Sequence, residues 1–424
     1  MSLDGATVVV VGAGYPSKRR LYQRATQLGA RVVLVDEPGH WSSTLADEGE
    51  VANWIGAPIV GEADRDAAAV LDALDTAGIR PDAVTTFWED EVCVVARVAA
   101  ALGLAGNPVA AIDTARSKVR TRELSRQLGL PTPRAKRVRS LDELFAAADH
   151  VGFPAVVKPE FGASAMGCVR VDDVDSLPGV YRLVRDVVNP ETDGIFRSGN
   201  DLLLEQYLDG VEFDIDLVMS NGKCMFSSVS QNWPTAEPSF QEKGLHCPPD
   251  HDRKAVGKLV ELAVDTAQKF GLGRGVLHIE GKCTSRGPRL VEVNARMGGG
   301  RVYEIVRDVW GVDLVEMQLR ASLDLPVGPR PSRKPQCYAA NLFIHAPATG
   351  RLTSLPLPAT TQPGCLDIDI DIDAEIGDAV SGPEAIFASV LAEVVITAKD
   401  IKRARQVADE VIRNAPHVEP APLP

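Results

Sequence analysis

The sequence predicts an α/β domain followed by α+β domains in a chain of 424 residues. Up to about residue 110, short β-branched runs alternate with helical patterns, which is typical of βαβ units on a parallel sheet. Later strand patterns follow one another with fewer helices between them. A chain of this length also exceeds what one hydrophobic core usually supports, so we expect several packed domains.

The N-terminal domain, residues 1–112, is predicted to be a small Rossmann-like unit. Its strand patterns cover residues 7–11, 32–36 and 83–87. The first turn, Gly12-Ala13-Gly14-Tyr15-Pro16-Ser17, lacks the third glycine of the dinucleotide fingerprint and carries Pro16 where the helix would begin. The turn therefore argues against an NAD-dependent oxidoreductase.

Three further segments are predicted, with boundaries at residues 113–200, 201–330 and 331–424. A helix over 115–128 and a stop signal at 129–133 open the first of them. A long polar loop over 232–252 suggests a functional role. The last segment is expected to be a small α+β subdomain with strands at 338–345 and 390–397, a helix at 400–414, and a frayed tail from His417.

Composition excludes several classes of function. The formal net charge of −13 disfavours nucleic acid as a partner. No apolar run of about 18 residues is present to span a membrane, and the N-terminus lacks the features of a signal peptide. The seven cysteines contain no C-x-x-C pair, which indicates free thiols. We expect a cytoplasmic protein, and the sequence leaves a homodimer open.

Polar residues at alternate positions predict a metal site. Glu292, Asn294 and Arg296 share one face of a strand, because side chains in a strand alternate between faces. Glu280 lies on the preceding strand, and the short link predicts an antiparallel hairpin that brings it beside Glu292 and Asn294. Two carboxylates and an amide oxygen suit Mg²⁺, with phosphates completing its shell. Arg296 can stabilise developing negative charge.

A phosphate site is predicted around Lys158, although no G-x-x-x-x-G-K-[ST] motif occurs. A buried strand ends at this lysine. A loop of small residues, including Ser164 and Gly167, follows it, and such loops let backbone N–H groups approach phosphate oxygens closely.

A candidate nucleotide-base site follows at Glu205, Gln206, Tyr207 and Leu208, where a strand leaves into a turn. Glu212 on the next strand can accept hydrogen bonds from ribose hydroxyls. Asp214 and Asp216 share its face, and the sequence leaves open whether they belong to the site or to a solvated acidic surface.

Taken in order, Lys118, Val157-Lys158-Pro159, the loop 162–167, Glu205 to Leu208, Glu212, Glu280 and Glu292-Val293-Asn294-Ala295-Arg296 resemble the ATP-grasp superfamily over nearly the whole chain. The resemblance implies an ATP-grasp fold with ATP between two α+β subdomains, the first acting as a lid. It implies that Lys118 and Lys158 hold ATP phosphates, that 205–208 line the adenine pocket, and that Glu212 binds ribose. Glu280, Glu292 and Asn294 would hold Mg²⁺, with Mn²⁺ as an alternative, and Arg296 would be catalytic.

Within that superfamily, Thr86-Phe87-Trp88-Glu89, Phe240 to Gly244 and Asn294 to Gly299 resemble carnosine synthases and bacterial L-amino acid ligases. By this resemblance Glu89 would help bind an amino group. Residues near the amino acid substrates would be Glu242, His246, Met297, Gly298 and Arg301. The segment Lys243 to Pro248 departs from both groups, so the substrates stay open.

His278 is expected to be a hydrogen-bonded structural residue, whereas for His246 a substrate contact and a structural role are both open.

The expected function is ATP- and Mg²⁺-dependent amide formation between an amino acid or related carboxylate and an amine, through an acyl phosphate. Glu242 is one candidate to accept the amine proton. The alternatives are an ATP-grasp carboxylase or purine-pathway ligase that uses bicarbonate or a phosphorylated amine, and a non-catalytic nucleotide-binding regulator.

Overall fold

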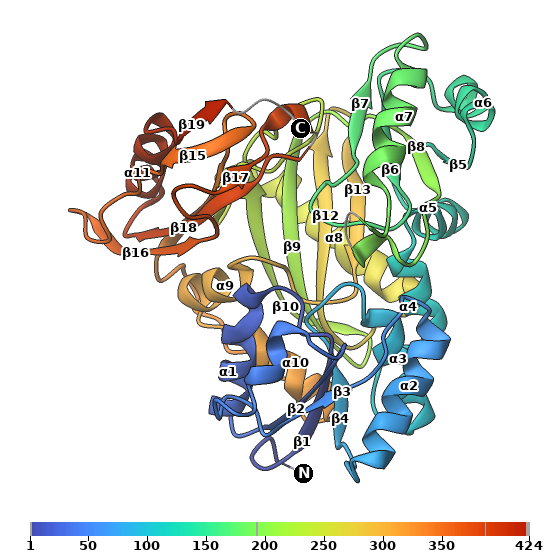
Figure 1. The fold of residues 1–424 in the computed structure, drawn as a ribbon, viewed down its shortest axis with the longest axis vertical. Coiled ribbons are helices and arrows are strands. Elements are labelled where there is room, and N and C mark those ends of the chain that lie inside the picture. The colour runs from blue at the N-terminus through green and yellow to red at the C-terminus, as the bar shows by residue number, and fades with distance from the viewer. Residues whose placement is uncertain (1, 192–193, 386, 421–424) are drawn as a thin grey trace.

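A computed structural model describes residues 2–191, 194–385 and 387–420. In Figure 1 the N-terminal segment (blue), the lid segment (teal to green) and the C-terminal segment (orange to red) surround the central strands β9, β12 and β13. Among the described residues, no helix combines the length and apolar character needed to cross a membrane.

The N-terminal segment forms a parallel sheet with the strand order β3-β2-β1-β4. Alternate residues of β1 face two layers: Val8 and Val10 pack with Leu21 of α1, while Val9 and Val11 pack with Val70 of α2. Burial on both faces explains the continuous apolar runs. The elements are β1 (Thr7–Val11), α1 (Arg19–Gln27), β2 (Arg31–Asp36), β3 (Asn53–Gly56), α2 (Ala63–Thr76), β4 (Ala83–Thr85) and α3 (Val92–Ala101).

Two helices replace the one predicted over 115–128. Ser117 separates them, because its backbone is extended and its side chain accepts a hydrogen bond from the N–H of Arg120 as an N-cap. The lid sheet that follows has the order β5-β8-β6-β7. The elements are α4 (Val109–Arg116), α5 (Lys118–Gln127), β5 (Ala135–Val138), α6 (Leu141–Val151), β6 (Ala155–Pro159), β7 (Val169–Val171), α7 (Leu177–Val187) and β8 (Leu202–Gln206).

The central sheet has eight antiparallel strands in the order β13-β12-β9-β10-β11-β14-β18-β16. The predicted hairpin of β12 and β13 is confirmed, with Glu280 opposite Glu292 and His278 opposite Asn294. The elements are β9 (Val211–Ser220), β10 (Lys223–Asn232), β11 (Gly244–Cys247), α8 (Arg253–Phe270), β12 (Gly275–Thr284), β13 (Gly287–Asn294), α9 (Val302–Trp310), α10 (Leu314–Ser322), β14 (Tyr338–His345), β16 (Cys365–Ile372), β18 (Val390–Ala398) and α11 (Ile401–Arg413).

The C-terminal segment extends the central sheet, so the predicted boundary near residue 330 does not separate two sheets. Its strand β14 pairs with β11, and α11 packs over β14 and β18. A small second sheet has the order β17-β15-β19. The tail prediction was wrong for 417–420, which pair with β15 as a strand, and 421–424 lie outside the described residues. These strands are β15 (Gly350–Ser354), β17 (Ala379–Val380) and β19 (His417–Pro420).

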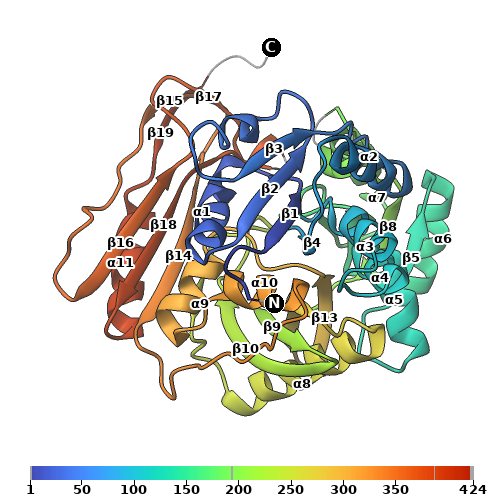
Figure 2. The same ribbon diagram turned by 90° about the horizontal axis from the view of Figure 1, so that it is seen from below.

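Short 3-10 turns complete the described elements, at Pro16–Lys18, Trp41–Thr44, Gly194–Phe196 and Pro383–Ala385. Seen from below in Figure 2, the N-terminal sheet lies between the lid segment and the C-terminal segment. The N-terminal domain therefore borders both parts of the molecule that flank the central strands.

Candidate active site

A cavity of about 130 Å³ lies between the lid sheet and the central sheet. Its walls bring together residues from α5, β6, β8, β9, β12 and β13. The predicted residues that line it are Lys118, Lys158, Ser164, Glu205, Gln206, Tyr207, Leu208, Glu212, Glu242, Glu280, Glu292, Asn294 and Arg296.

Lys118 connects the lid to the central sheet. As the first residue of α5 it is buried, and its Nζ lies 2.9 Å from Oε1 of Glu292 and donates to the carbonyl oxygen of Gly162 at 3.0 Å. One ammonium group thus contacts both the small-residue loop and a carboxylate of β13.

Lys158 points into the same cavity from β6 and is held by Glu205. Its Nζ donates to Oε1 of Glu205 at 2.9 Å, while Nε of Arg122 donates to Oε2 at 2.6 Å. Burial alone would raise the pKa of Glu205, but Arg122 and Lys158 outweigh it and lower that pKa. Glu205 is therefore an anion paired with two cations, of which Lys158 lines the cavity and Arg122 is buried outside it.

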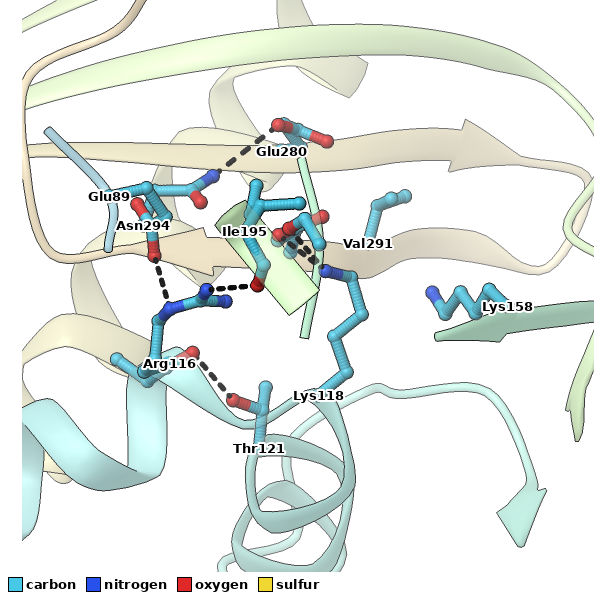
Figure 3. A network of polar contacts seen from close by, with 12 residues as sticks. Glu89, Arg116, Lys118, Thr121, Lys158, Ile195, Glu280, Val291 and Asn294 are labelled. Atoms are coloured by element: carbon cyan, nitrogen blue, oxygen red, sulfur yellow. Dashed lines mark hydrogen bonds and ion pairs between the residues drawn. The ribbon is translucent and has the colours of Figure 1, made fainter. Parts of the chain in front are cut away.

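The predicted metal residues lie together on β12 and β13. Nδ2 of Asn294 donates to Oε1 of Glu280 at 3.4 Å (Figure 3). Burial and then the neighbouring Glu292 raise the pKa of Glu280 well above its usual range. Burial also opposes ionisation of Glu292, but Lys118 and Lys158 lower its pKa. The two facing carboxylates thus differ in pKa, which is raised for Glu280 and lowered for Glu292.

This donor set fits a divalent cation that also uses phosphate oxygens. Among the described residues, no group of three or more His, Cys, Asp or Glu side chains is arranged to hold a metal by itself. Mg²⁺ is usually bound by one or two carboxylates plus substrate phosphates and water. The raised pKa of Glu280 indicates a site that gains stability when a cation lies between the carboxylates.

A buried polar layer lies beside Glu280 on the same face of the central sheet. Asp216 accepts a hydrogen bond from Nδ1 of His278 at 2.9 Å, and Asp214 accepts one from Asn232 at 2.9 Å. Both aspartates are buried, so the solvated acidic surface left open by the sequence is excluded. His278 is hydrogen-bonded as expected.

Tyr207 and Lys282 form the end of the cavity predicted to hold a base and ribose. Nζ of Lys282 lies 5.9 Å from the ring centre of Tyr207 and 3.3 Å from Oε2 of Glu212. The hydroxyl of Tyr207 donates to Glu237 at 2.7 Å. The ring and the carboxylate are therefore held in place by neighbouring charges.

The small-residue loop contains strained backbone. Ser164 and Ala165 have φ values of 52° and 57°, and Gly167 has a φ of 71°. Positive φ at non-glycine residues is uncommon and clusters at functional sites. Gly167 is buried at the base of the loop, where an added Cβ would lie 3.2 Å from Val188, so it shapes the loop and does not line the cavity.

Arg296 lies between the first cavity and a second one of about 130 Å³. It follows β13, which ends at Asn294, so the predicted strand ends two residues early. Its Nε lies 2.8 Å from Oε2 of Glu89. The two cavities also share Ala163, Ser164 and Met166 of the loop.

Lys18 completes the second cavity beside Trp88, and this lysine was not predicted. Nζ of Lys18 lies 5.7 Å from the ring centre of Trp88. Burial, and then Arg296 and Arg20, lower the pKa of Lys18 to about 7. In the sequence, only the segment that contains Glu89 and resembles the family indicated this part of the site. Lys18 was missed because the loop after β1 reaches Arg296 only through tertiary packing.

The structure does not bring four predicted substrate residues into either cavity. His246 is fully buried in β11, where it bonds to Trp233 and Arg405, so the proposed substrate contact is corrected to a structural role. Arg301 forms ion pairs with Asp369 and Asp371 of β16. Met297 is in the core, and Gly298 packs against Val302 and His278.

Glu242 does line the first cavity. Burial, and then Asp214 and Glu212, raise its pKa to about 8. Glu242 is nevertheless an exposed residue, and its side chain faces the cavity. It lies with the nucleotide-facing residues and not with Lys18.

Residues 151–304 match the ATP-grasp domain family, and residues 22–106 match the ATP-grasp N-terminal domain family. The chain belongs to the ATP-grasp superfamily. Its fold agrees: a solved L-amino acid ligase from Bacillus licheniformis superposes with a TM-score of 0.79 at 20% identity, covering 99% of both chains.

The curated proteins similar to this chain include a carnosine synthase and a bacterial ligase. Carnosine synthase 1 of Gallus gallus is 34% identical over 338 residues, which are 76% of this chain and 36% of that protein. Alanine–anticapsin ligase of Bacillus subtilis (strain 168) is 27% identical over 268 residues, which are 58% of this chain and 56% of that protein. The chain thus spans well under two thirds of the length of these relatives.

Proposed function

We propose that this ATP-grasp protein is a carboxylate-amine ligase that joins an amino acid or related carboxylate to an amine and converts ATP to ADP and phosphate. The observation that carries the proposal is the position of Arg296, which lines both cavities and pairs with Glu89. A phosphate-binding cavity and a cavity with both charge signs therefore meet at one guanidinium group.

In the first cavity, Lys118 and Lys158 would hold the phosphates of ATP, residues 205–208 its adenine and Glu212 its ribose. Glu280, Glu292 and Asn294 would hold Mg²⁺, or Mn²⁺ in its place, and the cation would neutralise phosphate charge. Positive side chains on one wall and carboxylates on the other fit a bound metal–nucleotide complex.

The carboxylate of the first substrate attacks the γ-phosphorus of ATP. The bond from that phosphorus to the β,γ-bridging oxygen breaks, which gives ADP and an acyl phosphate. Lys158 and Arg296 stabilise the negative charge that spreads over the transferred group. Closure of the small-residue loop excludes water, which would otherwise hydrolyse the intermediate.

The amine then attacks the carbonyl carbon of the acyl phosphate, and the C–O bond to phosphate breaks. We propose Lys18 as the base that takes the proton from the incoming ammonium, because it lines the second cavity and has a pKa of about 7. Glu89 would bind the amino group, and Arg20 or Arg296 a substrate carboxylate. This pattern of charges fits an amino acid.

The proposal is tested by phosphate release from Mg-ATP with single and paired amino acids, including β-alanine, followed by mass spectrometry. We expect ADP, phosphate and a new amide only with a pair, and a much lower yield of all three in Glu292→Gln at the same Mg²⁺ concentration. Lys223→Met, on an exposed part of β10, is the control. Turnover with bicarbonate or a phosphorylated amine, and with no pair, would contradict the amide-ligase assignment and favour a carboxylase or purine-pathway type of ligase.

A further inference from the structure

A third cavity, of about 520 Å³, lies at the carboxyl edge of the N-terminal parallel sheet. We call it the carboxyl-edge cavity, and its lining includes Gly12, Asp36, Ile59, Trp88, Glu91 and Phe161. It is separate from the nucleotide cavity, with which it shares no lining residue. The mechanism above makes no use of it.

Its location is where open parallel sheets bind ligands. The chain runs from β1 through β2 to β3 on one side and then places β4 on the other side of β1. Ligands bind outside the carboxyl ends of the strands at such a switch point. Gly12 directly follows β1 and Asp36 ends β2, so the cavity occupies this crevice.

The crevice does not fit a dinucleotide phosphate. A Cβ added to Gly12 would lie 2.4 Å from Cγ of Glu91, and one added to Gly14 would lie 2.5 Å from the Trp88 ring. A carboxylate and an indole thus stand beside the turn where a pyrophosphate would approach backbone N–H groups. Asp36 already accepts hydrogen bonds from the N–H groups of Ala13 and Glu37, both at 2.7 Å.

Most of the charged side chains that line the cavity form ion pairs with one another. Arg97 pairs with Asp113 at 2.8 Å, Arg116 pairs with Asp90 at 3.0 Å, and Arg197 pairs with Glu37. Glu91 differs, because it is only 7% exposed and its Oε2 has no hydrogen-bond partner among the described residues. A buried carboxylate oxygen without a partner is costly unless a donor reaches it.

We propose that the carboxyl-edge cavity binds a small molecule that carries a protonated amine, with the amine against Glu91 and an apolar body against Ile59, Phe161 and Trp88. The ligand is either the amine substrate approaching the second cavity, which shares Tyr15 and Trp88, or a separate effector. Both the site and the chemical class of its ligand are inferred from the residues that line the cavity, so they do not depend on the ligase proposal.

The protonation state of Glu91 provides a second way to detect binding of an amine. Burial, and then Asp90 and Asp66, raise its pKa to about 8. A bound ammonium favours the ionised carboxylate. Binding near neutral pH therefore releases a proton, and the heat of binding depends on the ionisation enthalpy of the buffer.

The test is calorimetric binding of 2-phenylethylamine to the full chain, with 2-phenylethanol as its uncharged match and no ATP present. We expect the amine to bind at least about tenfold more tightly, with buffer-dependent heat. Glu91→Gln removes this preference, whereas Glu89→Gln in the second cavity and the exposed control Glu261→Gln keep it. Ala63→Trp, which narrows the cavity without changing its charge, weakens both compounds.

Equal binding of the two compounds, no binding, or loss of the preference in Glu89→Gln but not in Glu91→Gln would overturn the proposal. Steady-state kinetics then distinguish the two sources. A raised KM for the amine substrate in Glu91→Gln, with kcat unchanged, identifies the substrate as the ligand, and unchanged constants identify a separate effector. The calorimetry needs no turnover, so its failure would leave the ligase proposal intact.

Discussion

Nζ of Lys118 lies 2.9 Å from Oε1 of Glu292 and joins the first turn of α5 to β13. The pair links a proposed phosphate-binding cation to a proposed metal ligand. The same ammonium also holds the small-residue loop through the carbonyl oxygen of Gly162. Lys118 is therefore in a position to couple nucleotide binding to loop position.

Lys118→Met should raise the KM for ATP and lower kcat/KM by about a hundredfold, because one phosphate contact and the loop contact are lost together. Initial rates of phosphate release across ATP concentrations measure this effect. Lys223→Met, an exposed lysine on β10, should change neither constant. Unchanged kinetics in Lys118→Met would remove this residue from the nucleotide site.

Metal dependence should respond to Glu280 and Glu292. Glu280→Gln or Glu292→Gln should raise the Mg²⁺ concentration needed for half-maximal rate by at least about tenfold, because one charged ligand is lost. The control is Glu261→Gln, because Glu261 is an exposed residue of α8. A Mg²⁺ requirement equal to that of the unmodified protein would show that these carboxylates do not bind the cation.

The same metal requirement should depend on pH. The pKa of Glu280 is raised, so part of its population keeps a proton that a cation must displace. Raising the pH removes that proton beforehand, and the Mg²⁺ requirement should fall as pH rises. Glu280→Gln should flatten this trend, which titrations at several pH values would measure.

The sequence predicted the hairpin that holds Glu280 and Glu292 because alternation and a short link determine strand register locally. It did not predict the position of His246. That residue lies in β11, which pairs with β14 from almost 100 residues later. The partners of this polar segment are distant in sequence, so local composition indicated a loop.

Buried charged residues were the second feature that was hard to predict from the sequence. Alternating polar residues on β9 are compatible with a solvated face, yet Asp216 is buried because His278 of the adjacent β12 neutralises it. Arg301 is likewise held by Asp369 and Asp371 of β16, a strand that the sequence did not predict. Such pairings depend on strand neighbours that only the complete sheet order defines.

Lys18 should give kcat a distinctive pH profile. Its pKa of about 7 means that the neutral, proton-accepting form increases as pH rises through 7. At saturating amine, kcat should therefore rise over this range and level off near pH 8. Lys18→Gln should lower kcat by about a hundredfold and remove that rise. An unchanged profile in Lys18→Gln would exclude Lys18 as the base, even if the rate were lower.

The buried pair of His278 and Asp216 should control stability at alkaline pH. Burial would lower the pKa of His278, but Asp216 raises it to about 10, above its ordinary value of 6.5. A folded-state pKa above the unfolded value stabilises the protein fully below about pH 6.5, and that stabilisation is lost as pH rises through about 10. The thermal unfolding midpoint should therefore fall between pH 7 and 10.

Asp216→Asn should lower the midpoint at pH 7 by about 5 °C and flatten its pH dependence, because the cation loses its partner. Differential scanning calorimetry measures both effects, with the exposed Asp265→Asn as control. Parallel pH curves for Asp216→Asn and the unmodified protein would show that the pair does not carry this stabilisation.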